Sequence, residues 1–242
     1  MFRSGNPALR NDVFTSAPAH SSSEVMTIQG TVNKTLVLLM LVVLAANWSW
    51  KNPGVVAGFM LPAIIIGAIV GFVTVFKKEW ASVTAPMYAL IEGVVLGAIS
   101  VYFERVYPGI VIQAVGLTFG TLFSLLLAYK SGLIRATENF KLGVVAATGA
   151  IAVVYLVSIV MGLFGKAMPF IHDSGPVGII FSLVVVTIAA LNLVLDFDFI
   201  EQGAEHGAPK YMEWYGAFGL MVTLVWLYLE ILRLLAKLRD RR

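Results

Sequence analysis

The sequence contains no cysteine and few charged residues. Without cysteine, disulfides, zinc–thiolate sites, iron–sulfur clusters and thiol catalysis are all excluded. Charged residues make up 13% of the 242 positions, about half of the roughly 25% found in soluble domains. A soluble fold of this size needs a charged surface. The composition therefore excludes a soluble enzyme, a nucleic-acid-binding domain and a disordered chain.

Catalytic signatures are also missing. The sequence has no H-E-x-x-H, no G-x-S-x-G and no G-x-x-x-x-G-K-[ST] motif. Its three histidines, His20, His172 and His206, lie far apart in polar segments. The last hydrophobic run has no aspartate before Asp240, which argues against an aspartyl intramembrane protease. We therefore predict neither an enzyme nor a resident cofactor.

Apolar residues dominate the chain: they form 59% of it, and the mean hydropathy is +0.87. A helix crosses the hydrocarbon core of a bilayer with roughly 20 apolar residues. Seven runs are predicted to do so: 35–50, 53–76, 80–103, 106–129, 142–165, 174–195 and 214–229. The sequence thus predicts an all-α membrane protein, with a disordered cytoplasmic tail at 1–30 and a seven-helix transmembrane domain at 31–242.

The distribution of lysine and arginine predicts the orientation, because these residues are enriched in cytoplasmic segments. With the N-terminus inside, nine basic residues fall in inner segments and three in outer ones, which supports a cytoplasmic N-terminus. The C-terminal tail adds five more, from Arg233 to Arg242. Seven crossings would place that tail outside, whereas six crossings and a re-entrant segment would place it inside. The run lengths favour seven.

Glycine pairs spaced four apart predict close helix packing, since small residues let helix backbones approach one another. There are four such pairs in the apolar runs: Gly54/Gly58, Gly67/Gly71, Gly93/Gly97 and Gly116/Gly120.

Four carboxylates lie where lipid is expected: Glu92, Asp196, Asp198 and Glu230. Charge at that depth is costly unless the group is paired, protonated or hydrated. Arg233 follows Glu230 by one helical turn and could neutralise it. Two carboxylates facing each other across helices would share a proton, or would hold a divalent cation when ionised. Each could instead reach the membrane interface or hydrogen-bond to the backbone.

The segment 196–213 is the most acidic stretch, and it adds Glu201, Glu205 and Glu213 to the two aspartates. It could attract cations to a pore mouth. A solvated loop is the other interpretation.

Several stretches resemble one known family. The run L-V-L-D-F-D-F-I at 193–200 resembles the end of the sixth helix of the Bax inhibitor-1 family. The run G-L-T-F-G-T-L-F at 116–123, continuing to Arg135, looks like its fourth helix and basic loop, and 227–235 is similar to its last helix. Glu92 and Gly93 fit a third-helix pattern. The resemblance covers roughly 32–238 and is closest to the bacterial YccA-like branch.

This resemblance implies a fold in which six helices surround a central C-terminal helix. It also implies a pH-dependent Ca²⁺ leak controlled by an aspartate of the sixth helix, which faces an aspartate of the seventh. Asp196 matches the first aspartate and is the candidate Ca²⁺ ligand. The place of the second falls at Thr223, which cannot ionise, so Glu230 is its candidate substitute. The basic partner that the family uses would be Lys77 or Lys78, with Arg233 as a further candidate.

Two functions follow as expectations. The first is a pH-sensitive calcium leak channel in the bacterial inner membrane, gated by protonation of Asp196, Glu230, Asp198 or Glu92. Its partners would be the lipid bilayer, Ca²⁺ and protons, with no nucleic acid. The second is a regulatory integral membrane protein that binds another membrane protein, such as a membrane-bound ATP-dependent protease. An exchanger would be expected to contain an inverted repeat, and none is evident.

Overall fold

The computed structural model describes residues 25–165 and 173–241. Most of the tail predicted at 1–30 therefore lies outside the described residues, as do Lys166 and His172. The described elements are helices: α2 (Ile28–Lys51), α3 (Pro53–Ala57), α4 (Met60–Phe76), the 3₁₀ turn η2 (Lys78–Trp80), α5 (Ala81–Val106), α6 (Ile110–Lys130), α7 (Glu138–Leu163), α9 (Pro176–Glu205) and α10 (Met212–Asp240). Because α2 begins at Ile28, the last residues of the predicted tail belong to the helical domain.

Six of the described helices are long and apolar enough to cross a membrane: α2, α5 with η2, α6, α7, α9 and α10. The apolar run 53–76 is not one continuous helix, because the chain breaks at Gly58 and Phe59 into α3 and the 17-residue α4. Pro62 explains the break. It has no N–H to donate to the carbonyl of Gly58, and its ring clashes with that carbonyl in a continuous helix.

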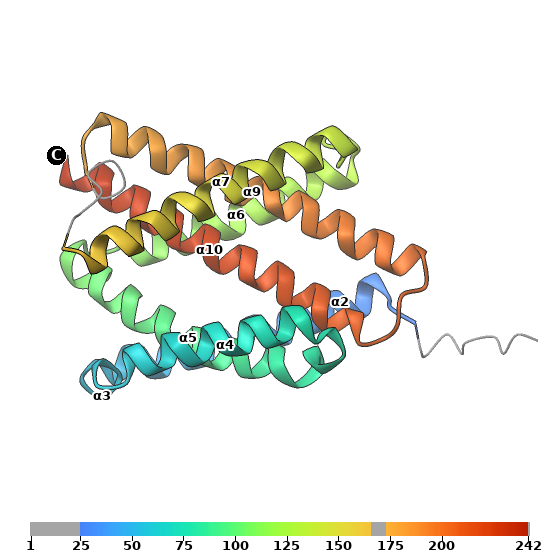
Figure 1. Ribbon diagram of the computed structural model, residues 1–242, viewed down its shortest axis with the longest axis horizontal. Coiled ribbons are helices and arrows are strands. Elements are labelled where there is room, and N and C mark those ends of the chain that lie inside the picture. Colours follow the sequence, from blue (N-terminus) through green and yellow to red (C-terminus); the bar gives the residue numbers. More distant parts are fainter. Residues whose placement is uncertain (1–24, 166–172, 242) are drawn as a thin grey trace, which may run out of the picture.

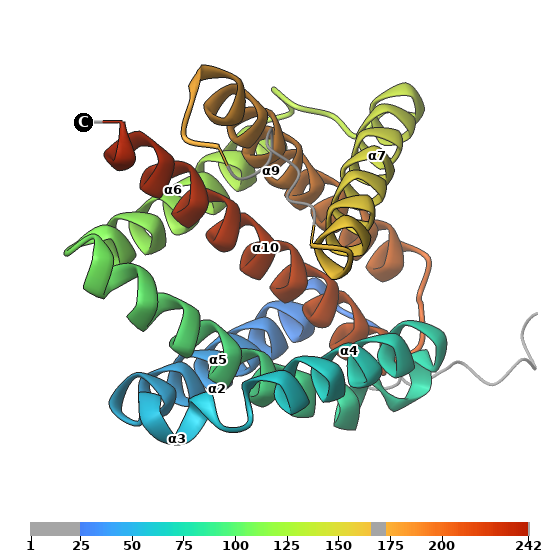
Figure 2. The ribbon, with the colours of Figure 1, turned by 60° about the vertical axis from the view of Figure 1, so that its left-hand side comes forward.

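Helix α10 runs through the middle of the molecule (Figures 1 and 2) and is the most buried of the six. It packs against α2, α5, α6 and α9, whereas α4 packs mainly on α5 and α7 mainly on α9. One apolar cluster joins α10 to α6 and α9, and a second joins α10 to α2 and α5. The C-terminal helix is thus central, with four helices packed along it and α4 and α7 outside them.

The close packing predicted for the glycine pairs is clearest at Gly93 and Gly97 of α5. A Cβ atom at Gly93 would lie 2.5 Å from the carbonyl oxygen of Val42, and one at Gly97 would lie 2.4 Å from that of Ala46. Helices α2 and α5 can meet at this distance only because neither glycine carries a side chain. The other pairs pack less closely, and no atom lies within 4 Å of a Cβ at Gly54, Gly116 or Gly120.

The two ends of the described chain lie at opposite ends of the helix bundle (Figure 1). Val25 forms an isolated β-bridge with Pro209, in the turn between α9 and α10. At the other end of α10, Asp240 accepts hydrogen bonds from the hydroxyls of Tyr107 and Ser174. The N-terminal end is therefore fixed beside the α9–α10 turn, and the C-terminal end beside the connections that precede α6 and α9.

Candidate functional site

Asp196 lies inside α9, which continues beyond the apolar run to Glu205. It shares a helical stripe with Ala189, Leu193 and Ile200, three buried residues at the spacing of one helix face. This stripe faces α10, so folding carries the carboxyl group into the α9–α10 interface. There the hydroxyl of Thr223 lies beside it, and a Cβ at Gly219 would lie 3.8 Å from its Oδ1.

The Oδ2 atom of Asp196 is buried and has no hydrogen-bond partner among the described residues. No ion pair with Asp196 is formed within residues 25–165 and 173–241 either. A buried carboxylate oxygen without a partner is costly, and such exceptions are rare in folded proteins. Thr223 faces Asp196 from α10. This is the position at which the resemblance places the second aspartate.

Asp198 points to a different helix. Its Oδ2 lies 2.9 Å from the Nζ of Lys141 at the start of α7, and it accepts a 2.7 Å hydrogen bond from Gln202. The two aspartates are two residues apart, so a helix turns them about 200° from one another. One therefore faces α10 while the other forms an ion pair with α7.

Glu230 is buried in α10 and does not meet Asp196. Its Oε1 accepts a 2.7 Å hydrogen bond from the hydroxyl of Tyr155 in α7. Arg233, one turn later, places its Nη1 2.9 and 3.0 Å from the two carboxylate oxygens and also donates to the Tyr155 hydroxyl. The ion pair predicted from the i, i+3 spacing is present, and it satisfies Glu230 locally. The geometry gives no support to Glu230 as the substitute for the second aspartate.

Glu92 lies between α5 and α4. The hydroxyl of Tyr88, one turn earlier on α5, interacts with it, and a Cβ at Gly67 of α4 would lie 3.9 Å from its Oε2. Within the part of the chain that the structure describes, Glu92 forms no ion pair. It is a second carboxylate without a basic partner, one residue before Gly93, which packs against Val42 of α2.

The structure thus distributes the four predicted carboxylates over four interfaces: α9–α10, α7–α9, α7–α10 and α4–α5. Within the described residues, no group of three or more His, Cys, Asp or Glu side chains is placed to hold a metal ion. The Ca²⁺ site expected at Asp196 would have Thr223 as the neighbouring oxygen donor and no second carboxylate.

The predicted basic partners, Lys77 and Lys78, also lie apart from Asp196. Lys77 ends α4 and is exposed, and Lys78 lies over the ring of Tyr215, with its Nζ 5.3 Å from the ring centre. Tyr215 is one turn of α10 before Gly219, which faces Asp196. Lys78 therefore approaches this region of α10 without forming an ion pair with Asp196.

Helix α7 contributes a stripe of polar contacts that the sequence pattern did not reveal. Lys141, Thr148 and Tyr155 are spaced seven residues apart, so they lie on one face of α7. Lys141 pairs with Asp198, and Tyr155 donates to Glu230. Thr148 accepts a 2.8 Å hydrogen bond from the amide of Asn192, on α9. Val144 and Ile151 are the buried residues of α7, so polar contacts carry much of its attachment.

Two further buried charges were missed. Glu213 belongs to the acidic segment 196–213, for which a solvated loop was one interpretation, but it is fully buried in the first turn of α10. It accepts hydrogen bonds from the backbone N–H and the hydroxyl of Thr27, and pairs with Lys34 and Lys210. The nearby lysines were visible in the sequence, but their convergence depends on the α2–α10 contact.

Lys237 is the second buried charge. It lies near the end of α10, and its Nζ donates to the carbonyl of Gly178 and the hydroxyl of Ser182, at 3.0 and 2.8 Å. Its position seven residues after Glu230 places both on one face of α10.

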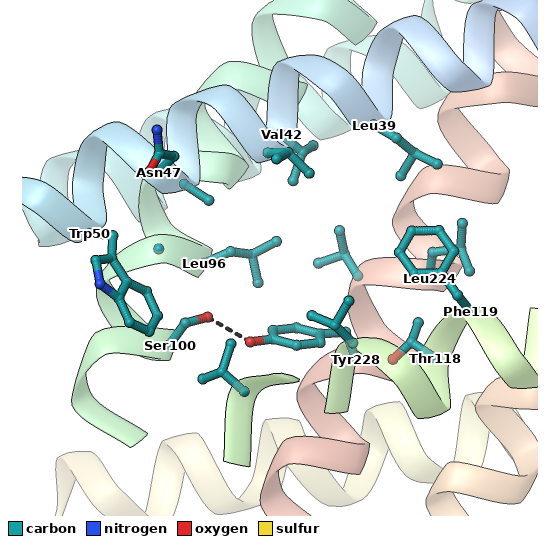
Figure 3. Close-up of a pocket in the computed structure, with 16 residues that line it drawn as sticks. Leu39, Val42, Asn47, Trp50, Leu96, Ser100, Thr118, Phe119, Leu224 and Tyr228 are labelled. Atoms are coloured by element: carbon teal, nitrogen blue, oxygen red, sulfur yellow. Dashed lines mark hydrogen bonds between the residues drawn. The ribbon is translucent and has the colours of Figure 1, made fainter. Parts of the chain in front are cut away.

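An apolar cavity of about 390 Å³ lies on the other side of α10, between α2, α5 and α6 (Figure 3). Its lining is almost entirely hydrocarbon. The hydroxyls of Ser100 and Tyr228 meet inside it at 2.7 Å, so each provides the other's hydrogen bond. Asp196 and the three other predicted carboxylates do not line this cavity.

Comparison with known protein families agrees with the order and spacing of these helices. A family model described as Bax inhibitor 1 like matches residues 6–240, which is nearly the whole chain. The chain therefore belongs to the Bax inhibitor 1 like family, as the sequence resemblance predicted. Among curated proteins, no match to this chain was found.

Proposed function

We propose that this membrane protein is a pH-sensitive leak pathway for Ca²⁺ and that Asp196 is its proton-responsive group. The observation that carries the proposal is the buried Oδ2 atom of Asp196, which has no hydrogen-bond partner among the described residues. An ionised carboxylate in that place lacks a compensating cation, and protonation removes its charge. When ionised, the same group attracts a cation. One side chain thus links the proton to the passage of the ion.

Polar groups along α9 and α10 support a route for the ion. Asp196 and Thr223 lie toward one end of this interface, and Asn192 with Thr148 follows one turn away on α9. Glu230 with Tyr155 comes next along α10. The last polar contact of the series is the hydrogen bond from Lys237 of α10 to Ser182 of α9. These contacts follow the interface of α7, α9 and α10 in that order, and polar residues inside membrane helices commonly mark such pathways.

We further propose that the chain crosses the membrane seven times, with α4 as the short second crossing and the N-terminus in the cytoplasm. The opposite positions of Val25 and Asp240 in the bundle support an odd number of crossings. The excess of lysine and arginine in the inner segments supports the orientation. The bacterial inner membrane and the YccA-like branch remain part of this proposal and rest on the resemblance alone.

The test is Ca²⁺ flux into proteoliposomes that contain the purified protein, measured from about pH 5 to 8, where a partly buried carboxylate changes its protonation. We expect flux that rises with pH, because the ionised carboxylate attracts the cation. Asp196→Asn should remove the pH dependence. Asp198→Asn is the matched control, since that aspartate lies two residues away and pairs with Lys141.

Absence of flux at every pH, with the protein shown to be folded, would overturn the proposal. The regulatory function, in which the protein binds another membrane protein, would then be the hypothesis to examine. If wild type and Asp196→Asn showed flux with the same pH dependence, the channel function would stand, but Asp196 would not be its proton-responsive group.

A further inference from the structure

The cavity beside α10 is lined by four helices, and the hydroxyl groups in its lining already have hydrogen-bond partners. Its other polar side chains, Asn47 and Trp50, lie on the last two turns of α2 and are exposed. Leu224 and Tyr228 of α10 form one wall, and Leu96 and Ser100 of α5 another (Figure 3). The hydroxyls of Ser100 and Tyr228 bond to each other. The hydroxyl of Thr118 donates to the carbonyl of Ala114, within α6. Since a buried water needs 2–4 polar partners, this cavity favours an apolar occupant.

Its open side faces the bilayer. Helix α2 packs on α5 and α10, and α6 packs on α10 and α9, so the cavity occupies the space left between α2 and α6. Val43 on α2 and Phe119 on α6 line this side and are 61% and 37% exposed. In a membrane-spanning protein, exposed apolar side chains of this kind contact lipid hydrocarbon. The cavity is therefore continuous with the acyl-chain region of the membrane.

The dimensions match one lipid tail. The lining of α2 runs from Leu39 to Trp50, which is about 16 Å at 1.5 Å per residue. That length is close to the depth of one leaflet, half of a hydrocarbon core about 30 Å thick. A helix of a partner protein, about 10–12 Å across with its side chains, is too wide for a cavity of this volume.

The end of the cavity at Trp50 fits the head-group side. Tryptophan is enriched at the membrane–water interface. Lys51 follows directly and is exposed at the end of α2. Its ammonium group complements the negative phosphate of a phospholipid.

We propose that this cavity is a binding site for one acyl chain of a membrane phospholipid, which enters between α2 and α6 and reaches Leu224 and Tyr228 of α10. The head group lies beside Trp50 and Lys51. The bound chain supplies the dispersion contacts that the cavity walls otherwise lack. The site is separate from the carboxylates of the proposed ion route.

The test uses a phosphatidylglycerol probe that carries a photoactivatable diazirine near the methyl end of one acyl chain. The full-length protein is reconstituted with the probe, irradiated and mapped by peptide mass spectrometry. We expect labels on 224–228 of α10, a segment that the surrounding helices otherwise shield from lipid. Labels confined to outward-facing residues such as Ile112, which is 71% exposed, would overturn the proposal.

A cavity-filling variant provides the second arm. Val115→Trp places a large side chain into the cavity from α6 and should abolish labelling of 224–228. Ile112→Trp is the matched control, because it adds the same side chain to the lipid-facing side of the same helix, and it should leave the labelling unchanged. Val111→Phe fills the cavity with a smaller change if the tryptophan variant does not fold. Labelling of α10 that persists in a folded filled variant would also overturn the proposal.

A second probe, phosphatidylcholine with the same diazirine chain, tests the head-group contact. Stronger labelling of 224–228 by phosphatidylglycerol in the wild type, lost in Lys51→Gln, would support it. Equal labelling by the two probes would contradict the proposed head-group contact, whereas the acyl-chain site would still be supported.

Discussion

The hydroxyl of Tyr155 donates a 2.7 Å hydrogen bond to the buried carboxylate of Glu230, and this contact attaches α7 directly to the central helix. Arg233 bonds to both groups, so the three side chains form a closed network. Because α7 buries few apolar residues, the network has a large share in holding it.

Tyr155→Phe removes this hydrogen bond while keeping the ring. We expect the free energy of unfolding to fall by about 0.5–1.5 kcal/mol, the usual contribution of one hydrogen bond. Thermal unfolding in detergent measures it. Tyr102→Phe is the control, because Tyr102 is 66% exposed. Equal stabilities of the two variants would show that the network does not hold α7.

Gly97→Ala should destabilise the bundle. The new Cβ would lie 2.4 Å from the carbonyl oxygen of Ala46, so α2 and α5 must separate. Overpacking of this kind costs about 1–3 kcal/mol. Gly116→Ala, in open space, should instead stabilise α6 slightly, because alanine favours helix by about 1 kcal/mol over glycine. Thermal melting of the two variants should shift in opposite directions, and shifts of the same sign would contradict the packing.

Thr223→Asp would place a second carboxylate beside Asp196. Two neighbouring carboxylates hold one proton between them more firmly than one carboxylate does. If the leak is gated as proposed, the rise of Ca²⁺ flux should move to higher pH than in wild type. Thr223→Ser, which keeps the hydroxyl beside Asp196 and cannot ionise, should keep the wild-type midpoint. If Ca²⁺ flux depended on pH in the same way in Thr223→Asp and wild type, residue 223 would have no influence on the protonation of Asp196.

Glu213→Ala should loosen the start of α2. It removes the acceptor of Thr27 and the partner of Lys34 and Lys210. Hydrogen bonds to charged groups contribute about 1.5–3 kcal/mol, so we expect a loss of that order. Hydrogen exchange of 25–34 should become faster. Glu205→Ala, at an exposed position in α9, should leave the exchange of 25–34 unchanged. An equally large increase in the Glu205→Ala variant would mean that the effect is not local to Glu213.

Reporters fused to the two ends of the chain should give opposite sides of the membrane. We expect this from the proposed seven crossings, because Val25 and Asp240 lie at opposite ends of the bundle. Alkaline phosphatase and green fluorescent protein, which are active on different sides, make the measurement. The same side for both ends would restore the arrangement of six crossings and a re-entrant segment.

Much of the fold followed from the sequence, because apolar length alone decides whether a helix can cross a bilayer. Six of the seven expected runs correspond to long helices, and the family was recognisable from short runs such as 193–200. The remaining run, 53–76, is interrupted at Gly58 and Phe59, before Pro62. Apolar length does not reveal this break, whereas the proline itself marks a kink or a helix start.

The site depended more on the tertiary structure. Helical spacing predicted the Glu230–Arg233 pair, since an i, i+3 contact is a local property of one helix. It did not predict that Glu230 meets Tyr155, that Glu213 is buried, or that a cavity lies beside Tyr228. These contacts join residues that are 75 to 186 positions apart, as with Tyr155–Glu230 and Thr27–Glu213. Helix composition fixes which segments enter the membrane, whereas rotation and packing of each helix decide which side chains meet.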